Sequence, residues 1–281
     1  MPVQPLITVE IAEGGTSVIK ITDNGKGIPK DEIRTAFMRH ATSKIDSFED
    51  LENVLTLGFR GEALSSIASV AQVEMLTRTE SDSMGTRIVI NGGVVDREEE
   101  CAANVGTVFY VKNIFFNTPA RRKFLKKPAT EGSYISEIVN RIALGHPNIA
   151  IKYINNGNIV LQTNGDGNVK NSLFYIYGKD IASKMLNLES EKEGYILKGL
   201  VGKPELSRGN RNYENFFING RFIKSTLVQN AVEDAYKNKI MIGKFPIFAL
   251  NLIVPSNTVD VNVHPTKLEV RFSDEKLYFM I

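Results

Sequence analysis

The first part of the chain carries two hydrophobic patterns, one of period two and one of helical period. Alternating apolar residues, among them Ile7, Val9 and Ile11, predict a strand with one buried face. A double glycine then predicts a turn into a second strand over 16–22. The stretch "PKDEIRTAFM" predicts a helix over 29–38, because proline and acidic residues favour a first helical turn.

The same two periods continue to the end of the chain. We expect strands over 73–79, 86–91, 93–97, 106–113, 195–201 and 214–219. We expect helices in "SFEDLENVL" with Ser47 as cap, after the glycine-marked loop "GFRGEAL", after Thr118 and Pro119, and over 133–144 and 226–238. The dipeptide Asn156-Gly157 predicts a hairpin with a type I′ turn.

The polar stretch "NGDGN" at 164–168 is the best candidate for a linker. We therefore expect one domain over 1–166 and a second over 167–281. Strands and helices are mixed in both, which predicts an α+β chain.

Composition narrows the class of protein. The 281 residues carry a formal charge of only +2, so any site for a polyanion must be local. A single cysteine, Cys101, excludes an internal disulfide framework, and three histidines make a zinc site a poor expectation. No run is long and apolar enough to span a membrane, and the first residues do not form a signal peptide.

The stretch "TDNGKGIPKDEI" at 22–33 has two interpretations. Asp23, Gly25 and Gly27 are residues that turns prefer, so a simple turn explains them. A carboxylate can also accept a hydrogen bond from the amine of adenine, with glycines letting the backbone approach the ring. No GxxxxGK[ST] loop occurs, so an ordinary phosphate loop is excluded.

Two other loops admit a similar choice. In "LGFRGEALSSI" at 57–67, glycines lead directly into a helix whose free amides suit phosphate oxygens, or they only cap and pack. "RHATSKI" at 39–45 gathers hydroxyls and a lysine that suit phosphate, or forms a polar surface loop. Thr107 opens a strand, which β-propensity alone explains.

A basic segment stands out against the near-neutral chain. "PARRKFLKKPA" contains no acid, and its cations either contact a phosphate backbone or line a solvated surface; they are Arg121, Arg122, Lys123, Lys126 and Lys127. "VDVNVHPTKLEVRF" at 259–272 alternates strongly, breaks at a proline and places Lys267 just beyond the break.

Taken together and in this order, "DNGKGI", "RHATSKI", "GFRGEAL", "GTVFYV…FFNTPARRKFL", "FINGR" and "VDVNVHPTKLEVRF" resemble the N-terminal ATPase region of MutL-type DNA mismatch-repair proteins. The resemblance covers nearly the whole chain. The wider GHKL superfamily of gyrase-type, Hsp90-type and histidine-kinase ATPases shares D-x-G-x-G but not the strings "GFRGEAL", "NTPARRKFL" and "NVHPTK". The resemblance implies a gyrase/Hsp90-type α/β sandwich that holds Mg-ATP over 1–166. It implies a domain like the second domain of ribosomal protein S5 over 167–281, with a left-handed βαβ crossover.

The resemblance also assigns roles to residues of the ATP site. It implies that Asp23 binds the adenine amine and that Thr107 lies by the base near Asp23. It implies that Gly25 and Gly27 line the base pocket. Lys267 is expected to reach the γ-phosphate from the second domain. The remaining expected ligands lie in a lid and in a loop that wraps the phosphates: Thr42, Ser43, Lys44, Gly58, Phe59, Arg60, Gly61, Glu62, Ala63 and Leu64.

In the family, ATP closes paired N-terminal domains into a clamp on DNA and couples mismatch recognition to downstream repair. The resemblance therefore implies DNA, a MutS-type mismatch-recognition protein and a second copy of the chain as partners. It implies a bacterial, cytoplasmic and nucleoid-associated protein without membrane contact.

One departure concerns the family motif E-x-x-x-N-S-x-D-A-G-A, whose Glu is the general base and whose Asn holds Mg²⁺. Both are expected just before Met1 and are not in the chain, and neither are the N-terminal arm, the linker and the C-terminal dimerisation domain. The codons of "MPVQPL", read in another frame after one extra nucleotide, can spell Asp-Ala-Gly-Ala-Thr-Ala. We therefore expect an out-of-frame start in an interrupted gene, no metal ligand in the chain and weak nucleotide binding without turnover. The alternatives are a non-hydrolysing DNA-binding fragment and the remnant of a frameshifted gene.

Overall fold

The structure, a computed structural model, describes residues 4–38, 62–192, 194–255, 259–260 and 271–272. The described residues fall into two compact units. The first contains residues up to 140 together with 148–166, and the second contains 141–147 and the residues from 167 onward.

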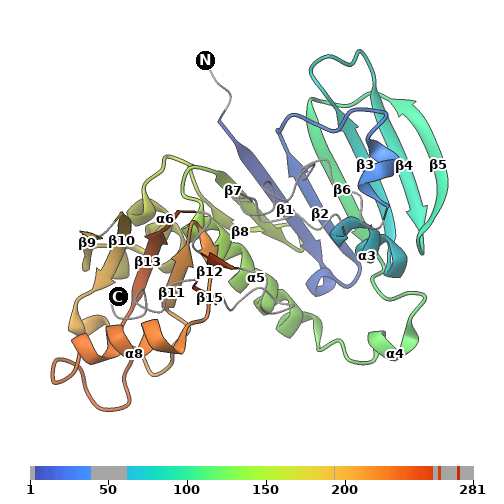
Figure 1. Cartoon of the computed structure of the whole chain (residues 1–281). Coiled ribbons are helices and arrows are strands. Elements are labelled where there is room, and N and C mark those ends of the chain that lie inside the picture. The colour runs from blue at the N-terminus through green and yellow to red at the C-terminus, as the bar shows by residue number, and fades with distance from the viewer. Residues whose placement is uncertain (1–3, 39–61, 193, 256–258, 261–270, 273–281) are drawn as a thin grey trace. The chain divides into compact units, whose positions relative to one another are not determined.

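The described part of the first unit is built on an eight-stranded sheet in the order β5-β4-β3-β6-β2-β1-β7-β8 (Figure 1). Neighbouring strands are antiparallel except β1 and β7, which pair in parallel. The strands are β1 (Leu6–Ala12), β2 (Val18–Asp23), β3 (Gln72–Arg78), β4 (Gly85–Asn91), β5 (Val94–Cys101), β6 (Gly106–Lys112), β7 (Ala150–Asn155) and β8 (Asn158–Gln162).

Helices cover one face of this sheet. They are α1 (Ile33–Ala36), α3 (Ala63–Val70) and α5 (Pro128–Gly145), whose residues up to 140 belong to this unit, with α4 (Pro119–Arg122) and the 3₁₀ turn η1 (Glu13–Gly15) in the connections. Ile33 of α1 and Ala68 of α3 join Val73 and Met75 of β3 in one buried cluster. On α5, the Ser136 hydroxyl lies 3.2 Å from the Tyr153 hydroxyl of β7. The core therefore lies between the helices and one face of the sheet.

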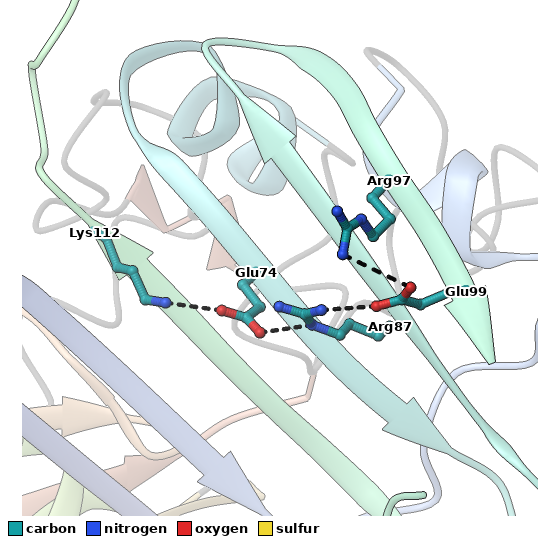
Figure 2. A network of polar contacts seen from close by, with 5 residues as sticks. All are labelled: Glu74, Arg87, Arg97, Glu99 and Lys112. Atoms are coloured by element: carbon teal, nitrogen blue, oxygen red, sulfur yellow. Dashed lines mark hydrogen bonds and ion pairs between the residues drawn. The ribbon is translucent and has the colours of Figure 1, made fainter. Parts of the chain in front are cut away.

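The opposite face of the sheet carries charged side chains, because successive residues of a strand point to opposite faces. Glu74 lies between two core residues of β3 and pairs with Lys112 of β6 and Arg87 of β4, each at 2.8 Å. Arg87 also pairs with Glu99 of β5 at 2.7 Å, and Arg97 lies 3.9 Å from Glu99. Figure 2 shows Lys112, Glu74, Arg87 and Glu99 in a row, with Arg97 next to Glu99. The hydrogen bond from Lys112 is the main cause that lowers the pKa of Glu74 below its ordinary value.

The described part of the second unit is built on a five-stranded sheet in the order β12-β11-β13-β10-β9. Only β11 and β13 pair in parallel. The strands are β9 (Met185–Lys192), β10 (Tyr195–Gly202), β11 (Glu214–Ile218), β12 (Arg221–Phe222) and β13 (Phe248–Ile253), and β14 (Val259–Asp260) pairs separately with β15 (Arg271–Phe272). The helices are α6 (Val169–Tyr177), α7 (Lys179–Ala182), α8 (Thr226–Ala235) and the 3₁₀ turn η2 (Pro204–Leu206).

This second sheet is apolar on both faces. Phe217 of β11 packs in a cluster with Leu173 of α6 and Ile181 of α7. Its neighbour Phe216 packs in a separate cluster with Val228 of α8. Strand β11 is buried along its whole length, as expected of a strand with helices on either side.

Most of the elements expected from the sequence are present, and the differences have local causes. Asn156 and Gly157 have φ of 49° and 80°, which confirms the type I′ turn. The helix expected over 29–38 is wrong in length, since only Ile33–Ala36 is helical. The helix expected over 226–238 ends at Ala235. The sequence did not indicate β9, whose residues are mostly exposed and therefore lack an apolar pattern. The expected helix at Ser47 lies outside the described residues.

Candidate functional site

Asp23 ends β2 beside two threonines of neighbouring strands. It pairs in register with Thr107 of β6, and Thr107 pairs in register with Thr77 of β3. All three have the same alternation phase as core residues such as Val73 and Val111. They therefore form a row on the helix-bearing face of the sheet, which we call the Asp23–Thr107–Thr77 row.

The turn after β2 leaves one carboxylate oxygen of Asp23 available. Oδ1 accepts a hydrogen bond from the Gly25 amide at 2.8 Å. The structural task at the strand end falls to Asn24, which accepts from the Leu6 amide at 2.8 Å and donates to the Gln4 carbonyl at 2.8 Å. Within the described part of the chain, no hydrogen bond to Oδ2 of Asp23 is present, so this oxygen can accept from a ligand.

Three glycines allow the close contacts around this row. A Cβ at Gly25 would lie 2.8 Å from Oδ1 of Asp23. Gly27 has a φ of 73° and would place a Cβ 2.1 Å from the Arg78 carbonyl oxygen at the end of β3. Gly106 has a φ of 114° and would place one 2.3 Å from the Asp23 carbonyl oxygen. A larger residue at Gly27 or Gly106 would clash with backbone atoms of a strand end, whereas one at Gly25 would meet only the side chain of Asp23.

Thr77 fixes the orientation of the hydroxyl beside Asp23. It is 1% exposed, accepts from the Ile28 amide at 2.9 Å and donates to the Gly106 carbonyl at 3.1 Å. Its oxygen also lies 3.2 Å from Oγ1 of Thr107. A hydroxyl has one proton, and Thr77 uses its proton in the hydrogen bond to the Gly106 carbonyl. The hydrogen bond between the two threonine hydroxyls is therefore donated by Thr107. Thr107 and Asp23 then both present acceptor lone pairs.

Sequence reasoning did not identify Thr77. The sequence nevertheless carries a signal. Residues 73, 75 and 77 of β3 point to the same face, and Thr77 is the polar residue after two apolar ones, Val73 and Met75. A buried polar side chain on a core face needs partners, and this one has three.

The other expected ligands divide into two groups. Glu62, Ala63 and Leu64 lie at the start of α3, where the Glu62 carbonyl accepts hydrogen bonds from the Ser65 hydroxyl and the Ser66 amide, both at 3.0 Å. Eight expected ligands lie outside the described residues: Thr42, Ser43, Lys44, Gly58, Phe59, Arg60, Gly61 and Lys267. Of the expected base-binding residues, the structure brings Asp23 and Thr107 together, with Gly25 and Gly27 in the adjoining turn.

The basic segment surrounds an exposed aromatic ring. All five of its cationic residues are exposed, and in the part of the chain that the structure describes no side-chain hydrogen bond or ion pair involves them: Arg121, Arg122, Lys123, Lys126 and Lys127. Phe124 in their midst is 80% exposed. Thr118 occupies the N-cap position of α4 as expected but makes no side-chain capping bond.

Two kinds of feature are absent from the described residues. They contain no group of three His, Cys, Asp or Glu residues placed to hold a metal ion. None of the helices in the described ranges has the length and apolar character needed to cross a membrane.

Comparison with known proteins reveals extensive sequence similarity. Residues 173–281 match the family model described as "DNA mismatch repair protein, C-terminal domain". The chain is 53% identical over 268 residues to the DNA mismatch repair protein MutL of Agathobacter rectalis, covering 95% of this chain and 41% of that protein. It is 44% identical to MutL of Caldanaerobacter subterraneus, covering 97% of this chain and 46% of that protein. The chain thus spans less than half the length of these curated relatives.

Solved structures show the same fold. The Aquifex aeolicus MutL ATPase domain complexed with ADP matches with a TM-score of 0.66 at 24% identity, covering 89% of this chain and 84% of that chain. An N-terminal domain of a DNA repair protein matches with a TM-score of 0.77 at 22% identity, covering 97% and 84%. The B-subunit of DNA gyrase from Myxococcus xanthus matches with a TM-score of 0.61 at 11% identity, covering 98% and 81%. These likenesses confirm the expected fold class.

Proposed function

The chain belongs to the MutL family of DNA mismatch-repair proteins, and on this premise we propose that its first unit binds ATP in the service of mismatch repair. The observation that carries the proposal is the Asp23–Thr107–Thr77 row, in which a carboxylate oxygen without a partner in the described chain lies beside an oriented hydroxyl. The fold shared with ATPase domains supports the same assignment.

The row suits adenine better than guanine. The exocyclic amine of adenine donates hydrogen bonds, and Oδ2 of Asp23 and Oγ1 of Thr107 are acceptors. Guanine has a carbonyl oxygen at the equivalent position, which would face the Asp23 carboxylate without a proton between them. The phosphates are assigned to the lid, the phosphate-wrapping loop and Lys267 from the family resemblance alone, and no residue of the chain is assigned to Mg²⁺.

Asp23→Asn tests the base assignment directly. A hydrogen bond to a charged group contributes about 1.5–3 kcal/mol, so we expect ATP affinity to fall about 10- to 150-fold. Because an amide also donates, GTP affinity should hold or rise. Asp31→Asn, which changes an exposed carboxylate in the loop after β2, is the matched control and should bind ATP as the unchanged chain does.

Isothermal titration with ATP, GTP and their non-hydrolysable analogues measures the unchanged chain and both variants without relying on turnover. Equal loss of ATP and GTP affinity in Asp23→Asn would show that Asp23 does not read the base. Unchanged ATP affinity would place the nucleotide elsewhere.

We further propose that ATP drives two copies of the chain to close as a clamp on DNA and signals to a MutS-type protein at the bacterial nucleoid. Family membership supports this role. The curated relatives of the family that the chain matches are more than twice as long as this chain. A non-hydrolysable ATP analogue should then convert the chain from monomer to dimer in light scattering. A mass that stays monomeric at saturating analogue argues against closure.

The basic segment is the proposed DNA contact. Five exposed cations without an acidic neighbour in the sequence stretch supply a strong local positive charge on a nearly neutral chain. Changing Arg121, Arg122 and Lys123 together to Glu should weaken duplex binding and lower the salt slope by roughly 0.9 for each lost phosphate contact. Unchanged affinity in fluorescence anisotropy would remove this segment from the DNA interface.

A further inference from the structure

The side chain of Phe124 is a distinctive feature of the first unit. It is 80% exposed, whereas large apolar side chains usually gain free energy by leaving water. A single exposed apolar side chain is ordinary on a protein surface, so what distinguishes Phe124 is its position among five cationic residues.

The backbone around Phe124 is ordered by hydrogen bonds. The Phe124 amide donates to the Arg121 carbonyl at 3.0 Å, and the Leu125 amide donates to the Arg122 carbonyl at 3.2 Å. The Lys126 amide donates to the Glu131 carboxylate of α5 at 2.7 Å. The ring is therefore presented from a fixed turn that precedes α5.

The surroundings of the ring indicate the chemistry of its partner. The residues on either side, Arg121 to Lys123 and Lys126 to Lys127, contribute five positive charges and no negative charge. Cations that follow a phosphate backbone, combined with an aromatic face on which a base can stack, form the usual recognition surface for single-stranded nucleic acid.

We propose that Phe124 stacks on an unpaired base, so that the basic segment binds single-stranded DNA more tightly than duplex. This inference rests on the proposed DNA contact of the segment and adds the part that reads the base. A duplex satisfies the cations but hides the faces of its bases, which leaves the ring without a partner. A protein partner with an apolar pocket is the alternative, and the experiment distinguishes it.

The test compares labelled oligothymidylate with a duplex of mixed sequence by fluorescence anisotropy over a series of salt concentrations. Phe124→Ala should weaken single-strand binding roughly 5- to 150-fold, the effect of removing one stacked base. Duplex binding and both salt slopes should stay the same, because no charge changes. Phe124→Tyr, which keeps the ring, should restore single-strand binding.

Phe174→Ala is the matched control, since Phe174 is 45% exposed on α6, in a stretch without a comparable basic cluster. It should bind both DNAs as the unchanged chain does. If Phe124→Ala leaves the ratio of single-strand to duplex affinity unchanged, the stacking inference is overturned and the ring belongs to a protein interface. If the charge-reversed variant of Arg121, Arg122 and Lys123 also binds DNA normally, the proposed DNA contact fails as well.

Discussion

Glu214 offers a test of how burial governs charge in the second unit. It opens β11 with a side chain that is 0% exposed, and in the part of the chain that the structure describes neither carboxyl oxygen has a hydrogen bond. Nε of Arg211 lies 3.9 Å from the Glu214 carboxylate, but Nε and Nη2 of Arg211 donate to the Glu233 carboxylate of α8, at 2.6 and 3.1 Å respectively. We predict that Glu214→Gln, which keeps the shape and removes the charge, stabilises the second unit above neutral pH.

The size of the expected stability gain follows from the pKa of Glu214. Burial is the main cause that raises the pKa of Glu214 from 4.5 to about 7, and the charge of Glu233 raises it further, against the lowering effect of Arg211. The native state therefore binds more protons than the unfolded state between these two values. Stability falls as pH rises through this window, and the loss is complete above pH 7. A shift of this size corresponds to about 3 kcal/mol, and Glu214→Gln should recover a large part of it.

The assay is urea denaturation, followed by circular dichroism, at about pH 5 and about pH 8. The unfolding free energies of the unchanged chain and Glu214→Gln should lie close together at the lower pH and diverge at the higher one. Glu189→Gln, which alters an exposed glutamate of β9, should show no such divergence. If Glu214→Gln shifts stability equally at both pH values, the carboxyl group titrates normally and the reasoning from burial is wrong.

Three further changes test the first unit. Thr77→Val leaves the Ile28 amide without its acceptor, so it should lower the unfolding free energy in urea by about 1–3 kcal/mol and weaken ATP binding. Thr77→Ser should keep the stability and the ATP affinity of the unchanged chain. If Thr77→Val changes neither, the role of the hydroxyl is refuted. Gly106→Ala brings a methyl group within 2.3 Å of the Asp23 carbonyl oxygen at a φ of 114° and should lower the melting temperature, at a cost of about 1–3 kcal/mol or more; an unchanged melting temperature would mean that the strands separate freely. Glu74→Gln should cost roughly 1 kcal/mol at neutral pH, less at high salt. Because the pKa of Glu74 is lowered, its contribution exists above pH 4.5 and disappears on acidification, so equal costs at neutral and acid pH would contradict the network.

The sequence predicted those parts of the fold that depend on local alternation and turn chemistry. Asn156-Gly157 indicates its hairpin because a type I′ turn requires positive φ at both central positions. Strand β9 gave no such signal, since an exposed edge strand with residues such as Glu189 and Glu191 needs no apolar periodicity. The helix expected over 29–38 is too long because only Ile33 among its residues is fully buried, which leaves one turn to be held by packing.

The candidate site was only partly predictable for a related reason. Asp23 is recognisable because it stands beside glycines in a fixed spacing, which is a local property. Thr77 is distant in sequence from both Asp23 and Thr107, and only the register of β2, β6 and β3 brings the three together. Register is a property of the assembled sheet, so a single sequence without its pairing cannot supply it.

The turn after β2 shows why a structural explanation and a functional one do not compete there. Asn24 satisfies the backbone of the neighbouring strand through Leu6 and Gln4, and the Gly25 amide occupies one oxygen of Asp23 and orients the carboxylate. Since these two residues meet the requirements of the turn, Asp23 needs only one of its two oxygens to support the fold. When neighbouring side chains make the hydrogen bonds that the turn backbone needs, the turn holds the carboxylate in place and leaves one of its oxygens available. A residue that binds a base as a fixed acceptor requires this arrangement.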